Sequence, residues 1–385
     1  MLTKEGCLQR QKNLWTVLPD SIESVLIGDD RHVQYFCGFR PNPISFSADQ
    51  QSALLLTRAG KSILFADNFT RRTATAEIFV SEEAIQPWYD HKHSVENRHQ
   101  ALSLVLRAHL SSVCHTTLLM EKEGVSVELA SVVSEALTDV VVDGQTKSLG
   151  TIVRELRRCK LPDEVALLQQ CMDAGAAGQA AAFGAVVPGA TELDVYIAVQ
   201  AAAQRSAGCA CIVYGDFRAT NAEAFKAGGL PTTYRLQDGD LMILDFSVVI
   251  AGYRSDFTNT VAVGEPTELQ VAQAAACIRA LHAAEPKLVA GGRCSAVFDA
   301  ANAMLVERGY PGLPHHAGHG LGMEHPESPI LVSQSTDTLV LGDVVTLEPG
   351  LYIEGTGGMR FEHNYVITDS GCKRLSHHEL GLRRA

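Results

Sequence analysis

The chain has 385 residues, of which 46% are hydrophobic and 20% charged, and its formal net charge is -12. This length exceeds one ordinary hydrophobic core and predicts two domains, while the negative charge argues against a nucleic-acid partner. No run is apolar enough for a signal peptide or membrane span, and ten cysteines without a Cys-x-x-Cys pair fit reduced thiols, so we expect a cytoplasmic protein.

Residues 1–150 are expected to form a small α/β domain. Short apolar runs alternate with helical stretches, the runs at 24–28, 52–57, 62–67 and 116–121 and the stretches at 96–110 and 126–137. The segment Asp30-Arg31-His32 should end a strand and begin a helix. A charged connector at 154–164 then leads into an Ala-rich helix, so the domain boundary is placed near residue 150.

The second domain, residues 151–385, contains an internal repeat. Two helix pairs, predicted at 163–185 with 192–206 and at 267–289 with 295–308, each precede a β-rich block. Thr191 and Asp194 are suited to a capping box. The two blocks, 236–263 and 339–368, align on a shared Gly-Asp pair. This pattern predicts an α+β domain with two halves related by a pseudo-two-fold axis.

Each block carries two carboxylates on either side of a Gly-containing turn. If each block is an antiparallel hairpin, Asp245 and Asp256 are direct cross-strand partners, and so are Glu348 and Glu362. Acids this close repel one another unless a cation lies between them. Bringing both halves together concentrates four carboxylates, which two divalent cations would neutralise.

A histidine-rich stretch, 315–329, contains His315, His316, His319 and His325. Alone, such a stretch is typical of a solvated loop. Beside four carboxylates, one of these imidazoles would complete a site suited to Mn²⁺, Fe²⁺, Co²⁺ or Zn²⁺. The residues alone do not select which histidine it is.

The ordered motifs DFSVVIAGYRSD, HHAGHGLG, LEPGLY and MRFEHN resemble the pita-bread family of creatinase, aminopeptidase P and prolidase. The resemblance implies a C-terminal pita-bread catalytic domain behind a creatinase-type N-terminal domain. It implies two divalent metals, Mn²⁺ first with Co²⁺, Zn²⁺ or Fe²⁺ as alternatives. The five ligands that it implies are Asp245, Asp256, His319, Glu348 and Glu362.

The resemblance also implies an activity, with Xaa-Pro dipeptidase or aminopeptidase as the best guess. Glu348 would take a proton from a metal-bridging water, His325 would assist catalysis, and His315, His325 and Arg360 would contact a small peptide. It further implies a homodimer. The family's histidine about a dozen residues before the first ligand block is absent from 226–240.

That absence keeps two alternatives open. One is a creatinase-like or lyase-type enzyme acting on a non-peptide small molecule. The other is a binding protein that has lost catalysis, which would usually have lost ligands too. Of the remaining histidines, His316 is expected to have a structural or solvent role, and His377 and His378 to be solvated.

Overall fold

The computed structural model describes residues 1–44, 52–74, 77–95, 97–113, 117–137, 140–141 and 147–382. The chain divides into two compact units, Met1–Arg157 and Arg158–Ala385. The boundary expected near residue 150 falls inside helix α6 (Leu149–Leu156), and the division follows the end of that helix. Within the described ranges, no helix is long and apolar enough to cross a membrane.

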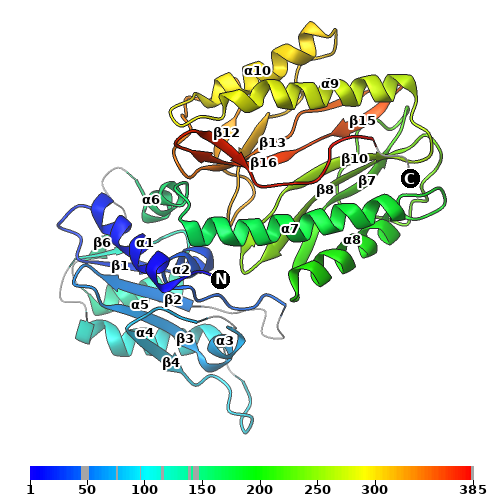
Figure 1. The fold of residues 1–385 in the computed structure, drawn as a ribbon. Helices are drawn as coiled ribbons and strands as arrows, with labels where there is room; N and C mark the ends of the chain where they lie inside the picture. The colour runs from blue at the N-terminus through cyan, green and yellow to red at the C-terminus, as the bar shows by residue number, and fades with distance from the viewer. Residues whose placement is uncertain are drawn as a thin grey trace. The chain divides into compact units, whose positions relative to one another are not determined.

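The first unit is built on one mixed sheet with helices packed against it (Figure 1). The strand order is β4-β3-β2-β1-β5-β6. The strands are β1 (Ser24–Ile27), β2 (Ser52–Thr57), β3 (Ser62–Asp67), β4 (Glu82–Gln86), β5 (Leu118–Met120) and β6 (Val140–Val141). The other helices are α1 (Lys4–Val17), α2 (Asp30–Cys37), α3 (Asn68–Thr73), α4 (Arg98–Val113) and α5 (Val127–Ala136).

The predicted strand-to-helix change at Asp30-Arg31-His32 is present in this unit. Strand β1 ends at Ile27, and the Asp29 side chain caps α2 by accepting from Arg31 N. An Asp at this position satisfies an amide that has no partner inside the helix, which explains why the helix begins there. Leu26, Leu55 and Phe65 form part of the fully buried core beneath the helices.

In the second unit, two helix pairs lie on the outside of the strands (Figure 1). The pairs are α7 (Pro162–Ala185) with α8 (Glu192–Ala207), and α9 (Glu268–Ala284) with α10 (Cys294–Glu307). Short helix η1 (Glu285–Lys287) follows α9. As predicted, Thr191 and Asp194 form a capping box at the start of α8. Amides in the first turn of a helix have no partner within it. Pro162 has no main-chain N–H group and therefore suits the first turn of α7.

The strands of this unit form three sheets. One has the order β10-β8-β7 with β9 attached, another the order β12-β11-β13-β16-β17, and the third pairs β14 with β15. The first contains β7 (Ile212–Thr220), β8 (Leu241–Ile250), β9 (Tyr253–Arg254) and β10 (Phe257–Ala262). The others contain β11 (Gly318–Gly320), β12 (Glu327–Leu331), β13 (Val344–Leu347), β14 (Gly350–Ile353), β15 (Gly357–Arg360), β16 (His363–Thr368) and β17 (Gly371–Arg374).

The predicted register of the first hairpin was wrong by two residues. Asp245 lies opposite Thr258 and not opposite Asp256. The turn residues are Ala251 and Gly252, both with positive φ, so the hairpin folds one residue later than predicted and each partner moves by two. A shift of two keeps a side chain on the same face, and Asp256 therefore remains a diagonal neighbour of Asp245.

The second hairpin has the predicted register. Leu347 pairs with His363 and Gly350 with Arg360, which leaves Glu348 and Glu362 at opposing positions between them. Both glutamates lie where the ladder is interrupted, outside the strands, and Asp256 likewise precedes β10. Three of the four carboxylates thus belong to residues without regular strand pairing.

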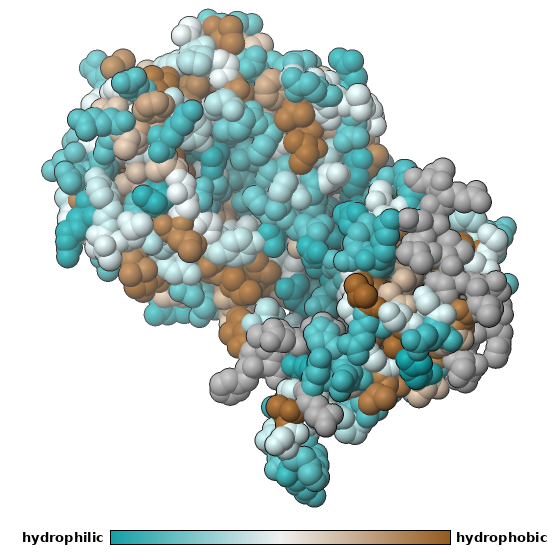
Figure 2. All heavy atoms as spheres, turned by 180° about the vertical axis from the view of Figure 1, so that it is seen from behind, coloured by the Kyte–Doolittle hydropathy of each residue, from teal (hydrophilic) through white to brown (hydrophobic). Residues whose placement is uncertain are grey.

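Hydrophobic side chains on the face seen in Figure 2 form small groups separated by polar residues. Exposed apolar residues of the second unit, such as Leu230, Leu269 and Leu341, come from three separate segments. Scattered residues of this kind are normal for a folded protein and identify no docking surface.

Candidate metal centre

The five residues predicted as ligands come together in the second unit. Asp245 lies in β8, Asp256 directly precedes β10, and His319 lies in β11. Glu348 directly follows β13, and Glu362 directly precedes β16. One oxygen each of Asp245, Asp256 and Glu362 lie within 4.8 Å of one another. His319 Nε2 is 3.3 Å from Asp256 Oδ2 and 3.3 Å from Glu348 Oε1. Every member is thus within reach of a common ion or ion pair.

A threonine hydroxyl joins the carboxylates of the two halves. Thr258 Oγ1 lies 2.9 Å from Asp245 Oδ1 and 2.9 Å from Glu362 Oε2. A hydroxyl has one hydrogen and can donate to only one of these oxygens at a time. Glu362 Oε1 is buried and has no hydrogen-bond partner. A buried oxygen without a partner is costly, and a cation would satisfy it.

Burial and mutual repulsion perturb the carboxyl groups strongly. Burial, with repulsion from Asp256 and Glu348, raises the pKa of Asp245 to about 6 although Arg360 opposes the change. The same causes raise the pKa of Glu362 well above its ordinary value. Asp256 is also buried, but its bonds to His319 and His325 lower its pKa. Without bound cations, the site therefore retains protons at carboxyl groups that are normally ionised.

His319 is held with one ring nitrogen facing the carboxylates. Its Nδ1 lies 2.8 Å from Gly320 O, which can only accept, so Nδ1 carries hydrogen and Nε2 is directed at the acids. Burial lowers the pKa of His319, but the bond to Asp256 and the charge of Glu348 outweigh it and raise the pKa to about 9. A backbone carbonyl on the far nitrogen is the usual support of a metal-binding histidine.

The two positions next to His319 in the sequence have no room for a side chain. A Cβ at Gly318 would lie 2.0 Å from Thr346 O, and one at Gly320 would lie 2.2 Å from Ser328 O. These neighbours are main-chain atoms of adjacent strands and cannot rotate away. The GHG motif therefore reflects tight packing around the imidazole as well as its chemistry.

His325 also reaches the carboxylates. Its Nε2 is 3.0 Å from Asp256 Oδ2, and its side chain remains 41% exposed. The bond to Asp256 raises its pKa, although partial burial opposes this. The ring lies edge-on to His319 with centroids 4.6 Å apart. His325 is thus a partly solvent-accessible imidazole at the margin of the site.

His316 was expected to have a structural or solvent role, but it lies at the site. Its Nδ1 is 3.6 Å from Glu348 Oε1, and the side chain is 35% exposed. The expectation assumed an extended chain, whereas the backbone bends at Pro314 and His315 and brings both imidazoles inward. Burial lowers the pKa of His315 and of His316, so both are neutral at pH 7.

His315 has a fixed hydrogen-bonding pattern. Its Nδ1 lies 2.7 Å from His316 O and donates to it, and its buried Nε2 has no partner. In the neutral ring, Nε2 is therefore an acceptor. Gly350 leaves room for it, because a Cβ there would lie 3.2 Å from this nitrogen.

Arg360 lies between the carboxylates and a tyrosine that sequence reasoning missed. Its guanidinium is hydrogen-bonded to Asp245, and Nη1 donates to Tyr352 Oη at 2.6 Å. Arg360 Nε is also 3.9 Å from Glu348 Oε2. Strand alternation could have identified Tyr352, because it stands four residues after Glu348 and so faces the same side.

His378 was predicted to be solvated, and this is wrong. Its ring packs against Phe257 at 4.7 Å and His363 at 4.9 Å between centroids. Burial lowers its pKa to about 4. The tail folds back because Asn259 Nδ2 donates to Glu379 O at 3.0 Å. His377 is exposed, as expected.

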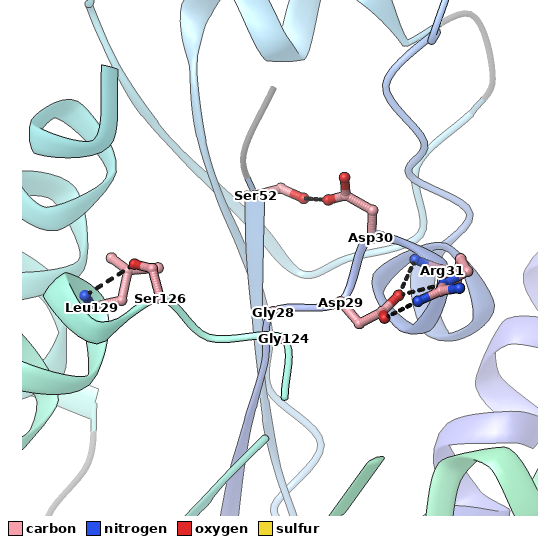
Figure 3. A pocket seen from close by; sticks show the side chains of 8 residues that line it. All are labelled: Gly28, Asp29, Asp30, Arg31, Ser52, Gly124, Ser126 and Leu129. Atoms are coloured by element: carbon pink, nitrogen blue, oxygen red, sulfur yellow. Dashed lines mark hydrogen bonds and ion pairs between the residues drawn. The ribbon is translucent and has the colours of Figure 1, made fainter. Parts of the chain in front are cut away.

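The first unit has a separate polar pocket of about 380 Å³ at the start of α2 (Figure 3). Its two acids already have partners: Asp29 pairs with Arg31, and Asp30 accepts from Ser52 Oγ at 3.1 Å. Among the residues that the structure describes, the possible metal-binding groups all lie in the second unit. The chemistry is therefore sought there.

Comparison with known proteins agrees with this architecture. Residues 166–369 match the model of metallopeptidase family M24, and residues 19–159 match that of the creatinase/prolidase N-terminal domain. An uncharacterized peptidase of Bacillus subtilis is 31% identical over 247 residues, which cover 62% of this chain and 67% of the relative. The Xaa-Pro dipeptidase of Pyrococcus furiosus is 29% identical over 243 residues, 61% of this chain and 68% of the relative.

Solved structures support the predicted fold. The X-Pro aminopeptidase of Thermotoga maritima has a TM-score of 0.78 at 19% identity, covering 98% of this chain and 99% of that one. The creatinase-type N-terminal domain followed by a pita-bread domain is thereby confirmed. Because the M24 match spans more than half of the chain and includes every residue of the carboxylate site, the chain belongs to metallopeptidase family M24.

Proposed function

We propose that the second unit is a dinuclear metallopeptidase that cleaves small peptides, with Xaa-Pro dipeptides as the preferred class. The observation that carries the proposal is the convergence of four carboxylates on the Nε2 face of His319. Glu362 Oε1 is buried without a partner, and repulsion among the buried acids helps to raise the pKa of Asp245, so the site lacks the positive charge that divalent cations would supply.

The ions would be held by Asp245, Asp256, His319, Glu348 and Glu362. Four carboxylates and one imidazole form an oxygen-rich donor set, which favours Mn²⁺, with Co²⁺, Zn²⁺ or Fe²⁺ as substitutes. When bound, such ions polarise a scissile carbonyl and acidify the attacking water.

Glu348 is the residue best suited to accept the proton of that water. Thr346 Oγ1 donates to Glu348 Oε1 at 2.8 Å and orients the carboxylate. The same hydroxyl accepts from His319 N at 3.1 Å, so base and ligand share one support. His316 stands beside Glu348, where a neutral imidazole can receive hydrogen bonds from water or substrate.

Three further residues are proposed to contact the peptide. His315 offers an acceptor at Nε2, which suits an N–H group of the substrate. Arg360 offers a cation that suits a carbonyl or carboxylate oxygen. His325, partly exposed and bonded to Asp256, is positioned to donate a proton to the leaving amine.

The name of one relative supports the substrate class. The Pyrococcus furiosus protein is called an Xaa-Pro dipeptidase, and its 29% identity extends over a stretch longer than the second unit. We further propose, from the family, a homodimer in the cytoplasm. Gel filtration with light scattering would test the dimer.

The proposed activity is tested with protein stripped by chelator and reloaded with Mn²⁺. Ala-Pro, Leu-Pro and Gly-Pro would be assayed beside tripeptides with proline in second position. We expect dipeptide cleavage that needs metal and is lost in Glu348→Gln. A protein that holds about two ions per chain and cleaves none of these peptides would refute the Xaa-Pro assignment.

A second candidate is a family member acting on a non-peptide small molecule. Residues 226–240 contain no histidine, and Gly228 and Gly229 instead contact Asp216, whose Oδ1 accepts from Gly229 N at 2.6 Å. Full metal loading without peptide cleavage would favour this candidate. Cleavage of any of the dipeptides at ordinary peptidase rates would exclude it.

A further inference from the structure

The C-terminal segment Ser376–Leu382 is attached to the strands that carry the carboxylates. Asn259 lies in β10 and is fully buried, and both ends of its amide bond to the main chain of this segment. Nδ2 donates to Glu379 O at 3.0 Å, and Oδ1 accepts from Gly381 N at 3.4 Å. The packing of Leu380 and Leu382 against the hydrophobic core completes the attachment.

Asn259 is adjacent to the threonine that bridges the site. Along β10, Thr258 and Thr260 face the site, where they bond to the carboxylates and to Arg360, and Asn259 faces the opposite side. The tail holds Asn259 on the side of β10 that faces away from the site. It therefore also limits how far the neighbouring Thr258 Oγ1 can move between Asp245 and Glu362.

The start of the segment, at Ser376, is hydrogen-bonded to strand β16. Ser376 Oγ accepts from Asn364 N at 3.0 Å and lies 3.0 Å from His363 Nδ1. Asn364 Nδ2 in turn donates to Asp256 O at 2.5 Å. The residues after Glu362 and the main chain of Asp256 are thus both tied to the tail.

These contacts act where regular strand pairing is interrupted, although Glu362 N still donates to Thr258 O at 3.0 Å. Asp256 and Glu362 lie outside the strand ladders, so the regular pairing that positions most strand residues is missing for them. We propose that Ser376–Leu382 is a positioning clasp for the metal centre, with Asn259 as its positioning residue. The inference rests on the proposed function, since it assumes that these carboxylates hold metal.

The test uses the full chain and compares Asn259→Ala with wild type and with Asn68→Ala. Asn68 is a matched control, because its amide likewise donates to Tyr89 O and accepts from Trp88 N, but in the first unit. We expect Asn259→Ala to weaken Mn²⁺ affinity by roughly 10- to 100-fold, as other residues that orient ligands do. Asn68→Ala should bind Mn²⁺ as wild type does.

A second readout separates positioning from simple loss of stability. If the clasp positions the ligands, metal and tail must stabilise each other reciprocally. Mn²⁺ should therefore slow hydrogen exchange of the Gly381 amide in wild type at a temperature far below unfolding, and not in Asn259→Ala. Ser376→Ala removes the hydroxyl that accepts from Asn364 N while leaving Asn259 in place, and should also weaken Mn²⁺ binding.

The outcomes distinguish the two hypotheses. Wild-type protein that binds no Mn²⁺ would overturn the proposed function and the clasp with it. Wild-type protein that binds two ions, together with an Asn259→Ala variant of unchanged affinity, would overturn the clasp alone. If Asn259→Ala fails to fold, unchanged affinity in Ser376→Ala and tail exchange that is insensitive to Mn²⁺ would overturn the clasp in the same way.

Discussion

Metal-free protein should lose stability as the pH rises from about 6.5 to about 9, the interval over which His319 loses its proton in the folded chain. Asp245 has a pKa of about 6 in the folded chain against 3.8 ordinarily, and His319 has about 9 against 6.5. For each group the raised pKa means that the folded chain binds its proton more tightly. The contribution of such a group to the stability of the folded chain is complete below its pKa in the unfolded chain. It is lost as the pH rises through its pKa in the folded chain. Asp256 has a lowered pKa and loses its contribution only below about pH 4. Below pH 6.5 the loss at Asp245 is opposed by His363 and His378, whose pKa values are lowered to about 2 and about 4, so that their contributions to stability rise with pH up to 6.5. The loss at His319 is therefore the one expected above pH 6.5.

The magnitude follows from the His319 difference. His319 accounts for about two and a half pH units, worth roughly 3 kcal/mol at about 1.4 kcal/mol per unit. Because His319 bonds to Asp256 and the two groups titrate together, this figure is an upper bound. In a unit of this size, 1 kcal/mol shifts the unfolding midpoint by about 2–4 °C, so the decrease should be on the order of 10 °C.

Differential scanning calorimetry of chelator-treated protein between pH 6.5 and pH 9 would measure this decrease. Mn²⁺-loaded protein should show a much flatter profile, because bound cations replace the protons and bind more tightly as protons leave. His319→Gln should remove most of the decrease. A metal-free midpoint that is constant or rises over this range would refute the reasoning.

Other substitutions give independent checks. Thr258→Val should weaken Mn²⁺ binding by roughly 10- to 100-fold in a competition titration, because both bridged carboxylates lose their shared hydroxyl; unchanged affinity would contradict this role. Tyr352→Phe should lower kcat/KM by roughly 10-fold or more at full metal occupancy, because the Arg360 bond is lost; a change in metal content instead would point to a structural role. Gly320→Ala should destabilise the fold by at least about 1–3 kcal/mol in thermal unfolding, since its Cβ would meet Ser328 O. The control Gly184→Ala, in open space within a helix, should stabilise by about 0.5–1 kcal/mol.

Much of this architecture could be predicted from the sequence. Hydrophobic periodicity and capping residues located the helices to within a few residues, as for the helix predicted at 192–206 and found at Glu192–Ala207. The repeated Gly-Asp blocks identified all four carboxylates, since a repeat preserves spacing even when its sequence diverges. The exact boundary between the units was not readable, because helix α6 carries no signal that assigns it to either side.

The errors have physical causes. A hairpin's register follows from the centre of its turn: the turn at Ala251 and Gly252 pairs Asp245 with Thr258, whereas pairing Asp245 with Asp256 required a centre one residue earlier. His316 was misplaced because side-chain direction in a bent segment does not follow alternation. His378 packs against Phe257, which is more than a hundred residues away in sequence, and no local pattern reports such a contact.

The two glycines beside His319 also limit how this site can evolve. Because Gly318 and Gly320 accept no side chain, substitution at either position cannot be used to shift the imidazole relative to the carboxylates. Natural variation must therefore act elsewhere, on segments whose side chains have free space around them. His325, whose side chain is 41% exposed at the margin of the site, has such space. Substitution there can change the margin of the site while His319 stays in place.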